Sequence, residues 1–182
     1  MKNKKVLKKF FQEGKKVVIR YPRFSDWEDF LTVINSLVRE KAYISVQKKI
    51  NPEQERKWLK AALKSVRKKE KILLVLEVGG KVTGNALIEK ADRSSQSHIG
   101  NFGIILGQEA RGIGLSKEIF QALQKEAKAK FGLKIIKLNA CSANKRALSF
   151  YKKMGFKEIG RVKKGVKHYG RYLDEVLMVK YL

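Results

Sequence analysis

The sequence predicts one α/β (α+β) domain in which a mixed sheet carries helices on its faces. The length of 182 residues fits one compact domain of moderate size. Segments whose apolar residues alternate are interleaved with segments whose apolar residues recur at helical spacing, as expected where helices cover a sheet. No internal repeat and no low-complexity linker divides the chain. We therefore expect residues 1–182 to form a single domain.

Each expected element is bounded by residues that typically end a strand or cap a helix. Pro22 closes the first strand, and Ser25 or Asp26 is the expected N-cap of the helix that follows. Asn51 caps the second helix, with Pro52 at its first position. The segment 42–50 is compatible with a loop or with a short helix. In chain order we expect a strand at 15–21, helices at 25–40 and 51–69, strands at 71–78, 82–91 and 98–106, a helix at 116–132, a strand at 134–141, a helix at 144–155, and strands at 156–165 and 171–182.

The N-terminal extension, residues 1–14, is basic and is expected to form a short amphipathic helix. The apolar residues that fall on one side of this helix are Val6, Leu7, Phe10 and Phe11. The extension lacks an apolar stretch of secretory length, and no window approaches the roughly 18 apolar residues that span a bilayer. The single cysteine, Cys141, excludes an intramolecular disulfide. We expect a soluble protein of the cytoplasm.

The charge balance is strongly basic, because 42 lysines and arginines against 17 aspartates and glutamates give a net charge of +25. One interpretation is a solvated, lysine-rich surface that keeps the protein in solution. The other is attraction to an anion, such as RNA, the ribosome, a membrane surface or a polyanionic cofactor. Charge alone does not rank these partners, because it sets association rather than chemistry.

A glycine turn between a strand and a helix is the first candidate site. The segment "QEARGIGLSKEIF", residues 108–120, follows the apolar run "FGIIL" and leads into a helix. Such a turn gathers free backbone N–H groups at the positive end of a helix dipole, which suits an anion. The segment lacks the phosphate loop of nucleotide hydrolases, and Lys117 stands where the dinucleotide fingerprint needs a third glycine. Arg111 and the small Ser116 favour an anion site over a tight turn without a ligand.

A second cluster, residues 142–156, lies one strand and one helix further along the chain. Asn144 and Tyr151 are seven residues apart, so they project from the same side of a helix. Each alone has an ordinary structural explanation, Asn144 as a helix cap and Tyr151 as a core residue. Their order and spacing relative to the glycine turn instead favour a shared ligand site.

These two motifs resemble those of the GNAT superfamily of acetyl-CoA-dependent N-acetyltransferases. The first family motif is an aliphatic residue that ends a strand, followed by [Q/R]-x-x-G-x-[G/A] at the start of a helix. A serine replaces its last small residue here, and the matching residues are Leu106, Arg111, Gly114 and Ser116. The second motif, N-x-x-A-x-x-x-Y-x-x-x-G-F, is complete, and its residues are Asn144, Ala147, Tyr151, Gly155 and Phe156. The resemblance implies a mostly antiparallel sheet that splays at the cofactor-binding strands.

The resemblance also implies an acetyl-CoA site and no metal. The diphosphate would lie on the backbone amides of residues 111–116, and the pantetheine arm beside the backbone of residues 104–106 like an added strand. Tyr151 would be the acid that protonates the departing thiolate, and Asn144 would orient the cofactor or a water. The cofactor-binding residues implied in this way are Ile104, Ile105, Leu106, Arg111, Gly112, Ile113, Gly114, Leu115, Ser116, Asn144, Ala147 and Tyr151.

The general base is the part of the site that the resemblance leaves open. Many relatives carry a glutamate on the strand before the glycine turn, whereas this strand carries Asn101 and no carboxylate. His98, at the start of that strand, is of a residue type that titrates near neutral pH. Glu77 and Glu89, on neighbouring strands, would act through water. A chain of waters without a dedicated base is the remaining alternative.

The acceptor is expected to be a primary amine. The family recognises acceptors mainly through the first helices and the loop before the last strand, here residues 27–43 and 163–175. We favour the N-terminus of a protein or peptide, such as a ribosomal protein, because a basic protein would dwell near RNA. The alternatives are a small amine (an amino acid, a polyamine or an antibiotic) and, in another class, a non-catalytic basic protein that binds acyl-CoA or associates with RNA or the ribosome. Weak electrostatic association with RNA or the ribosome and formation of a homodimer are further expectations.

Overall fold

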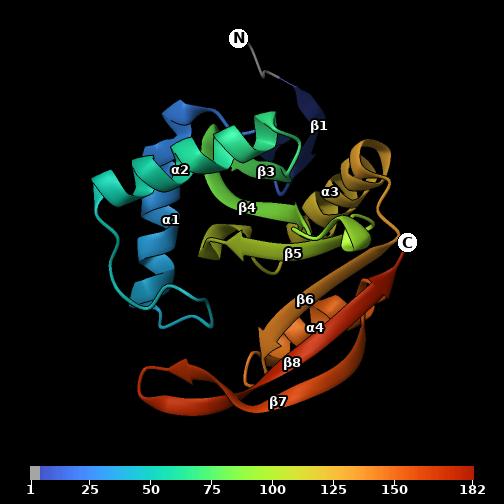
Figure 1. Ribbon diagram of the computed structural model, residues 1–182. Helices are drawn as coiled ribbons and strands as arrows, with labels where there is room; N and C mark the ends of the chain where they lie inside the picture. Colours follow the sequence, from blue (N-terminus) through green and yellow to red (C-terminus); the bar gives the residue numbers. More distant parts are fainter. Residues whose placement is uncertain (1–4) are drawn as a thin grey trace.

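The computed structural model describes residues 5–182, and these residues form one eight-stranded sheet with helices on both faces (Figure 1). The strands are β1 (Val6–Gln12), β2 (Lys15–Arg20), β3 (Lys71–Val78), β4 (Lys81–Lys90), β5 (Ile99–Leu106), β6 (Ile135–Cys141), β7 (Lys157–His168) and β8 (Arg171–Tyr181). The helices are α1 (Trp27–Arg39), α2 (Pro52–Arg67), α3 (Leu115–Phe131) and α4 (Lys145–Lys153), with short 3-10 turns at Phe24–Asp26, Ser94–Gln96 and Gln108–Ala110. Neighbouring strands follow the order β1-β2-β3-β4-β5-β6-β8-β7.

All neighbouring strands pair antiparallel except β5 and β6, so the sheet is mixed and mostly antiparallel, as predicted. The parallel pairing of β5 with β6 covers only residues 99–101 against residues 135–137. Beyond Asn101, β5 pairs with β4 alone, up to Leu106 opposite Gly84. Figure 1 shows β6 turning away from β5. The predicted splay is therefore present, and it leaves one backbone edge of β5 without a strand partner in the described part of the chain.

Apolar side chains fill the space between the sheet and the helices on each face. On one face, Ile119 and Phe120 of α3 enter the larger core cluster. On the other face, Phe30 of α1 and Leu59 of α2 pack on the sheet. Residues 72–76 of β3 are almost fully buried, since this strand is covered on both sides. This coverage explains why its sequence, "ILLVL", is a continuous apolar run rather than an alternating one.

The predicted N-terminal helix is wrong, because residues 6–12 form strand β1, which pairs antiparallel with β2. The chain reverses at Glu13 and Gly14, whose φ angles of +48° and +72° suit a tight hairpin turn. Residues 1–4 of the predicted extension lie outside the described residues.

A bulge explains why this strand resembles a helix in its sequence. The register shifts between Val6 and Lys8, which leaves Leu7 as an extra residue in β1. Leu7 and Phe10 both pack on the core, at a spacing that imitates one face of a helix. Phe11, which the helical interpretation placed on the same side, has 73% of its surface exposed.

The other predicted helices and strands are present, with ends that differ by a few residues. The segment 42–50 is a loop, and Asn35 holds its end by exchanging two side-chain hydrogen bonds with the backbone of Ile50 at 2.9 and 2.8 Å. Asn51 caps α2 as predicted, because its side chain accepts a hydrogen bond from the backbone N–H of Gln54 at 2.9 Å.

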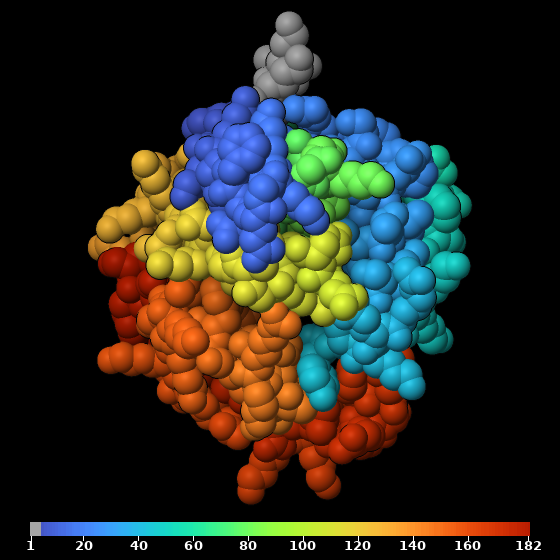
Figure 2. Space-filling view, turned by 180° about the vertical axis from the view of Figure 1, so that it is seen from behind, coloured from blue at the N-terminus to red at the C-terminus, as the bar shows by residue number. Residues whose placement is uncertain are grey.

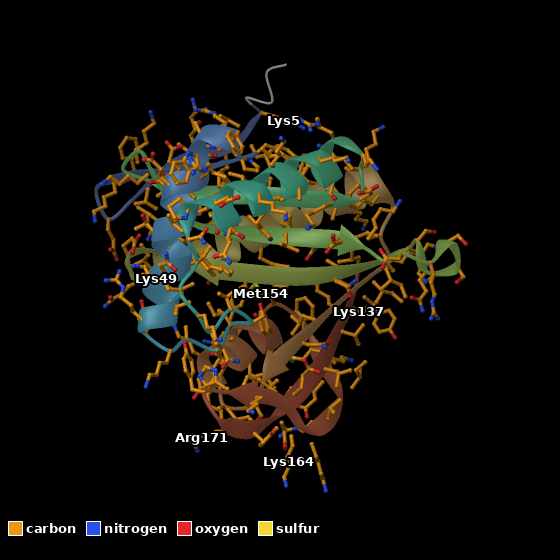
Figure 3. The ribbon with its side chains drawn as sticks, turned by 60° about the vertical axis from the view of Figure 1, so that its left-hand side comes forward. Lys5, Lys49, Lys137, Met154, Lys164 and Arg171 are labelled. Carbon is orange, nitrogen blue, oxygen red and sulfur yellow. The ribbon has the colours of Figure 1, made fainter. Side chains whose placement is uncertain are left out.

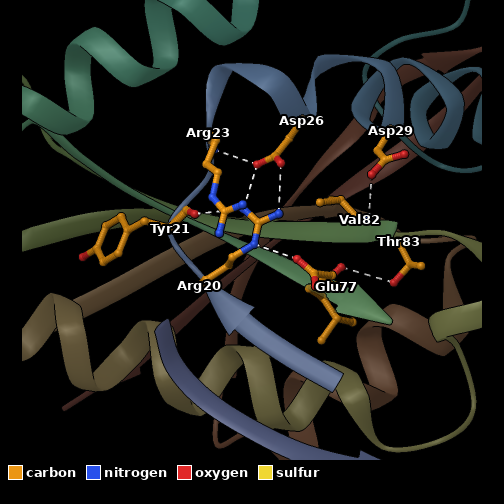
Figure 4. A network of polar contacts seen from close by, with 9 residues as sticks. Arg20, Tyr21, Arg23, Asp26, Asp29, Glu77, Val82 and Thr83 are labelled. Atoms are coloured by element: carbon orange, nitrogen blue, oxygen red, sulfur yellow. Dashed lines mark hydrogen bonds and ion pairs between the residues drawn. The ribbon is translucent and has the colours of Figure 1, made fainter. Parts of the chain in front are cut away.

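A buried ion pair joins the sheet to the start of α1 (Figure 4). Arg20, on β2, donates from its two terminal nitrogens to the Asp26 carboxylate at 2.8 and 2.9 Å, and from Nε to Glu77 at 2.8 Å. The backbone N–H of Arg23 donates to the same Asp26 carboxylate at 2.6 Å. Asp26, one of the two expected N-caps, therefore precedes α1, but its carboxylate is bound by Arg20 instead of the α1 backbone. The pair holds β2, β3 and α1 in one arrangement.

Candidate active site

An open cleft of about 480 Å³ lies at the end of β5, between the glycine turn, α4 and the segment after α1. Figure 2 shows the hollow where the residues around 40–45, in cyan, meet α4, in orange. The predicted cofactor-binding residues that line the cleft are Ile104, Ile105, Leu106, Arg111, Gly112, Ser116, Asn144, Ala147 and Tyr151. The fold thus brings the two sequence motifs together on one cavity.

The glycine turn has the backbone geometry of an anion site. Gly112 and Gly114 have φ angles of +87° and +84°, and Gly114 is the N-cap of α3. No side chain caps this helix end. Within residues 5–182, the backbone N–H groups of residues 112–116 donate no turn or side-chain hydrogen bond, so they remain available at the positive end of the α3 dipole.

Arg111 does not point freely into the cleft. Its Nε donates to the backbone carbonyl of Leu106 at 2.9 Å, and one terminal nitrogen pairs with the Glu40 carboxylate at 2.7 Å. The Arg111 guanidinium thus already donates to the Leu106 carbonyl, which lies on the edge of β5 that has no strand partner in the described part of the chain. A ligand that uses this carbonyl or the guanidinium has to replace one of these contacts.

Sequence reasoning missed Glu40 and Arg146, which both line the cleft. Glu40 is the one carboxylate in the lining among the described residues. Arg146 lies beside the turn, since a Cβ atom placed on Gly112 would be 3.5 Å from its guanidinium. Arg146 lies inside the second motif, where a cation two residues after the cap was a usable signal. Glu40 had no such signal, because it lies 71 residues from its partner Arg111.

Tyr151 lies on α4 with its ring in the core and only 8% of its surface exposed. The ring makes edge-to-face contacts with Phe102 and Phe156, with centroid distances of 6.1 and 5.9 Å. Burial raises the pKa of Tyr151 to about 12. The phenol therefore stays protonated at neutral pH and is a hydrogen-bond donor at the cleft.

Asn144 is the N-cap of α4, and its side-chain oxygen accepts from the backbone N–H of Ala147 at 3.2 Å. Asn144 therefore is the helix cap that its sequence position suggested. Asn144 also lines the cleft, so its cap position and its predicted contact with a ligand are compatible.

The structure does not bring the candidate bases together with Tyr151. His98 precedes β5, at the opposite end of that strand from the glycine turn, and does not line the cleft. Glu77 accepts a hydrogen bond from the buried Arg20, and Glu89 pairs with Lys71 at 3.2 Å. Neither glutamate lines the cleft, and Asn101 does not line it either.

Three predicted cofactor residues of the turn also lie outside the cleft lining, and they are Ile113, Gly114 and Leu115. Leu115 is buried in the core and Ile113 packs against it. Their side chains therefore anchor the turn, and only their backbone groups are suitably placed to meet an anion.

The two segments predicted to recognise the acceptor contact each other beside the cleft. The hairpin of β7 and β8 reaches the loop after α1, where His168 Nε2 lies 3.1 Å from the backbone oxygen of Lys41. The rings of His168 and Tyr43 are in tilted contact with centroids 4.7 Å apart, and Tyr169 donates its hydroxyl proton to the backbone oxygen of Val38. Tyr43 also lines the cleft. The loop after α1 thus lines the cleft, and the hairpin packs against this loop without contributing a residue to the described lining.

Basic side chains lie on both ends of the molecule, from Lys5 at one end to Lys164 and Arg171 at the other (Figure 3).

Within the described residues, no group of three or more His, Cys, Asp or Glu side chains is arranged to hold a metal ion. Across residues 5–182, no helix has the length and apolar character needed to cross a membrane.

The splayed, mostly antiparallel sheet, with a glycine turn and a helix N-terminus at the splay, agrees with the fold that the resemblance to the GNAT superfamily implies. The family whose sequence model matches is the acetyltransferase (GNAT) family, over residues 32–156. The chain therefore belongs to the GNAT acetyltransferase family.

Known relatives agree with this family. The L-amino acid N-acetyltransferase AaaT of Escherichia coli (strain K12) is 27% identical over 107 residues, which cover 59% of this chain and 66% of that protein. The ribosomal-protein-alanine N-acetyltransferase of Brucella melitensis superposes with a TM-score of 0.80 at 24% identity, over 90% of this chain and 99% of that chain. An acetyltransferase from Salmonella typhimurium, solved with its cofactor acetyl-CoA, has a TM-score of 0.79 at 20% identity, over 91% of this chain and 94% of that chain.

Proposed function

We propose that this protein transfers the acetyl group of acetyl-CoA to a primary amine, and that the amine is the N-terminus of a protein or peptide. The observation that carries the proposal is the meeting of an unbonded glycine turn, a free strand edge and a buried tyrosine on one cleft. Each of these three features suits a different part of acetyl-CoA.

The cofactor would be held chiefly by backbone groups. The amides of residues 112–116 and the N-terminus of α3 suit the diphosphate, with the Arg146 guanidinium beside them. The free edge of β5 at residues 104–106 suits the amide-containing pantetheine arm, in the manner of an added strand. A solved relative from Salmonella typhimurium carries acetyl-CoA, which supports this assignment.

Tyr151 would stabilise the leaving group as a hydrogen-bond donor. Acetyl-CoA supplies an activated thioester. The ammonium ion first loses a proton to water, the nitrogen then attacks the thioester carbon, and the C–S bond breaks to release a thiolate while the second proton on nitrogen also passes to water. Full transfer of a proton from a phenol of pKa about 12 to a thiolate whose conjugate acid has a pKa of about 8.5 is unfavourable by about 5 kcal/mol. A donated hydrogen bond carries no such cost and can be made throughout the neutral range.

Glu40 would help to hold the acceptor. An amine enters mostly as an ammonium ion, and Glu40 is the carboxylate that lines the cleft among residues 5–182. Phosphate binding to Arg111 would weaken the 2.7 Å pair with Glu40. The carboxylate would then face the ammonium, so acetyl-CoA is expected to bind before the amine.

A protein or peptide acceptor is supported by the open cleft, which the loop after α1 lines and against which the β7–β8 hairpin packs from outside the lining. The structural relative from Brucella melitensis is a ribosomal-protein-alanine N-acetyltransferase, which agrees with this acceptor class. A free amino acid is the second candidate, because AaaT of Escherichia coli is 27% identical over its matched region. A cytoplasmic location, a single domain over residues 1–182 and a homodimer belong to the same proposal.

Two measurements test the function. Acetyl-CoA should raise the melting temperature of the purified protein, and thiol release should then be measured with three acceptors. The acceptors are a peptide with a free N-terminus, the same peptide with a blocked N-terminus and a free lysine, and a panel of L-amino acids. Turnover confined to the first acceptor supports the proposal, and turnover confined to amino acids replaces the acceptor class. No thermal shift at millimolar acetyl-CoA would overturn the cofactor assignment and leave a non-catalytic basic protein.

A further inference from the structure

A second hollow, of about 500 Å³, lies where the C-terminal ends of α2 and α3 meet the start of β3. We call it the α2–α3 pocket. Its lining combines cations with apolar and aromatic side chains, and the residues are Lys5, Arg67, Lys69, Lys71, Lys130, Tyr21, Val66, Ile72 and Phe131. The 17 residues of α3 place this pocket about 25 Å from the glycine turn, so it is a separate site.

The α2–α3 pocket has more cationic side chains than carboxylates that pair with them. Lys5 and Lys130 share one carboxylate, that of Glu126, at 3.3 and 3.0 Å. Lys71 pairs with Glu89 at 3.2 Å. The two remaining cations, Arg67 and Lys69, are exposed and take part in no ion pair within residues 5–182.

Part of this positive charge has an ordinary explanation. α2 ends at Arg67 and α3 ends at Phe131, so the negative ends of two helix dipoles face the pocket. Each end is equivalent to about half a negative charge. Five cations therefore face two carboxylates and about one further negative charge from the helices. About two positive charges remain uncompensated.

The pocket wall is held in place before any ligand binds. Tyr21 donates its hydroxyl proton to Glu126 at 2.7 Å and accepts from Lys130 at 2.5 Å. Burial alone would raise the pKa of the Glu126 carboxyl, but hydrogen bonds from Tyr21 and Lys130 hold it below its usual value. The Lys130 ammonium also lies 4.4 Å from the centroid of the Tyr21 ring. The Lys71 side chain is only 13% exposed, so water screens its positive charge only in part.

We propose that the α2–α3 pocket binds the phosphate groups of a nucleotide, either free or as part of an RNA strand. The surplus of about two positive charges matches two phosphates of a strand or one diphosphate. The partly buried Phe131 and the floor formed by Val66 and Ile72 suit the face of a base. This pocket gives the expected association with RNA a defined place that is independent of acetyl transfer.

The test compares two variants with equal loss of charge. Arg67→Gln/Lys69→Gln removes the two unpaired cations of the pocket. Lys57→Gln/Lys60→Gln removes two exposed lysines elsewhere on α2 and is the matched control. Binding of a labelled ten-nucleotide single-stranded RNA is measured by fluorescence anisotropy at several salt concentrations. Binding of ADP is measured by calorimetry, with and without saturating acetyl-CoA.

The pocket variant should bind RNA about tenfold more weakly than the control, with a salt slope reduced by about 1.4 for two lost phosphate contacts. Binding of RNA alone identifies a strand as the source, and binding of ADP in the presence of acetyl-CoA identifies a free nucleotide. Equal weakening in both variants would overturn the proposal, because it reports net charge only. Absence of binding by both probes, or full displacement by acetyl-CoA, would overturn it as well. Circular dichroism of both variants checks that they fold.

Discussion

Replacing Tyr151 with phenylalanine removes one hydroxyl and keeps the buried ring. The contacts of the ring with Phe102 and Phe156 remain. Within residues 5–182 the hydroxyl makes no hydrogen bond, and it is not a fully buried orphan group. We therefore expect the free energy of unfolding at neutral pH to change by less than about 1 kcal/mol.

The effect on catalysis should be much larger than the effect on stability. One hydrogen-bond donor aimed at developing negative charge contributes about 10²-fold to kcat, or roughly 3 kcal/mol. The KM for acetyl-CoA should change little, because the turn and the free edge of β5 are untouched. Loss of kcat without loss of cofactor affinity is the signature of an interaction made in the transition state.

The pH dependence of the wild-type protein provides a second readout. Burial raises the pKa of Tyr151 to about 12, above the value of about 10 for an unfolded chain. The folded state therefore holds this proton more tightly, and the stabilisation is fully present below pH about 10 and is lost towards pH about 12. This stabilisation amounts to about 2.7 kcal/mol. Between pH about 10 and pH about 12, the free energy of unfolding of Tyr151→Phe should therefore fall by about 2.7 kcal/mol less than that of the wild-type protein.

The assays are steady-state thiol release at saturating amine and urea unfolding at pH 8, 10 and 11.5. Tyr151→Phe with wild-type kcat would refute the role of the hydroxyl. If kcat of the wild-type protein falls between pH 8 and 10 and kcat of Tyr151→Phe does not, the pKa of Tyr151 is not raised.

Other substitutions test other contacts. Asp26→Ala leaves the buried Arg20 with Glu77 alone, so unfolding should be easier by about 3 kcal/mol in urea titrations; an unchanged midpoint contradicts the role of the ion pair. Glu40→Gln should raise the KM of the amine about tenfold and leave acetyl-CoA affinity equal or higher; an unchanged amine KM argues against a contact. Gly114→Ala, at a φ of +84°, should cost about 1–2 kcal/mol and weaken acetyl-CoA in calorimetry; unchanged affinity argues against the turn as the diphosphate site.

The sequence was sufficient for the central part of the fold, because its signals there are local. Asn51 with Pro52 marks a helix start, and the covered strand β3 reads as an unbroken apolar run. The glycine turn and the cluster around Asn144 and Tyr151 were each recognisable from residues close together in the chain. Their shared cleft follows from the fold, which places α4 next to the end of β5.

The misses depend on events that residue periodicity does not record. A bulge shifted Leu7 onto the face of Phe10, so a strand acquired the spacing of a helix. Glu40 meets Arg111 only through the tertiary fold, so its place in the cleft had no sequence signal. The contact of Glu77 with the buried Arg20 also had no sequence signal; Glu77 was a candidate base acting through water because it lies on a neighbouring strand.

Because the sheet splays, the pairing of β5 with β6 in its middle is short. Within residues 5–182, the strands β1 to β5 pair with the other three strands only at residues 99–101 opposite 135–137, next to two backbone hydrogen bonds from Lys134 and Ile135 to the carbonyl of His98. Gly100 lies at this junction, where a Cβ atom would be 2.6 Å from Ile88 and 2.7 Å from Leu133. A side chain there would have to displace the buried side chains of Ile88 and Leu133.

A molecule bound along the free edge of β5 therefore acts as a missing strand. The sheet consists of two parts joined by a short pairing of β5 with β6, and a ligand bound in the proposed position would add backbone-like hydrogen bonds along β5. We expect amide hydrogen exchange in β6 to slow when the cleft is filled, although β6 keeps its own partner β8. A pantetheine arm bound as we propose would, while it is bound, also be part of the secondary structure.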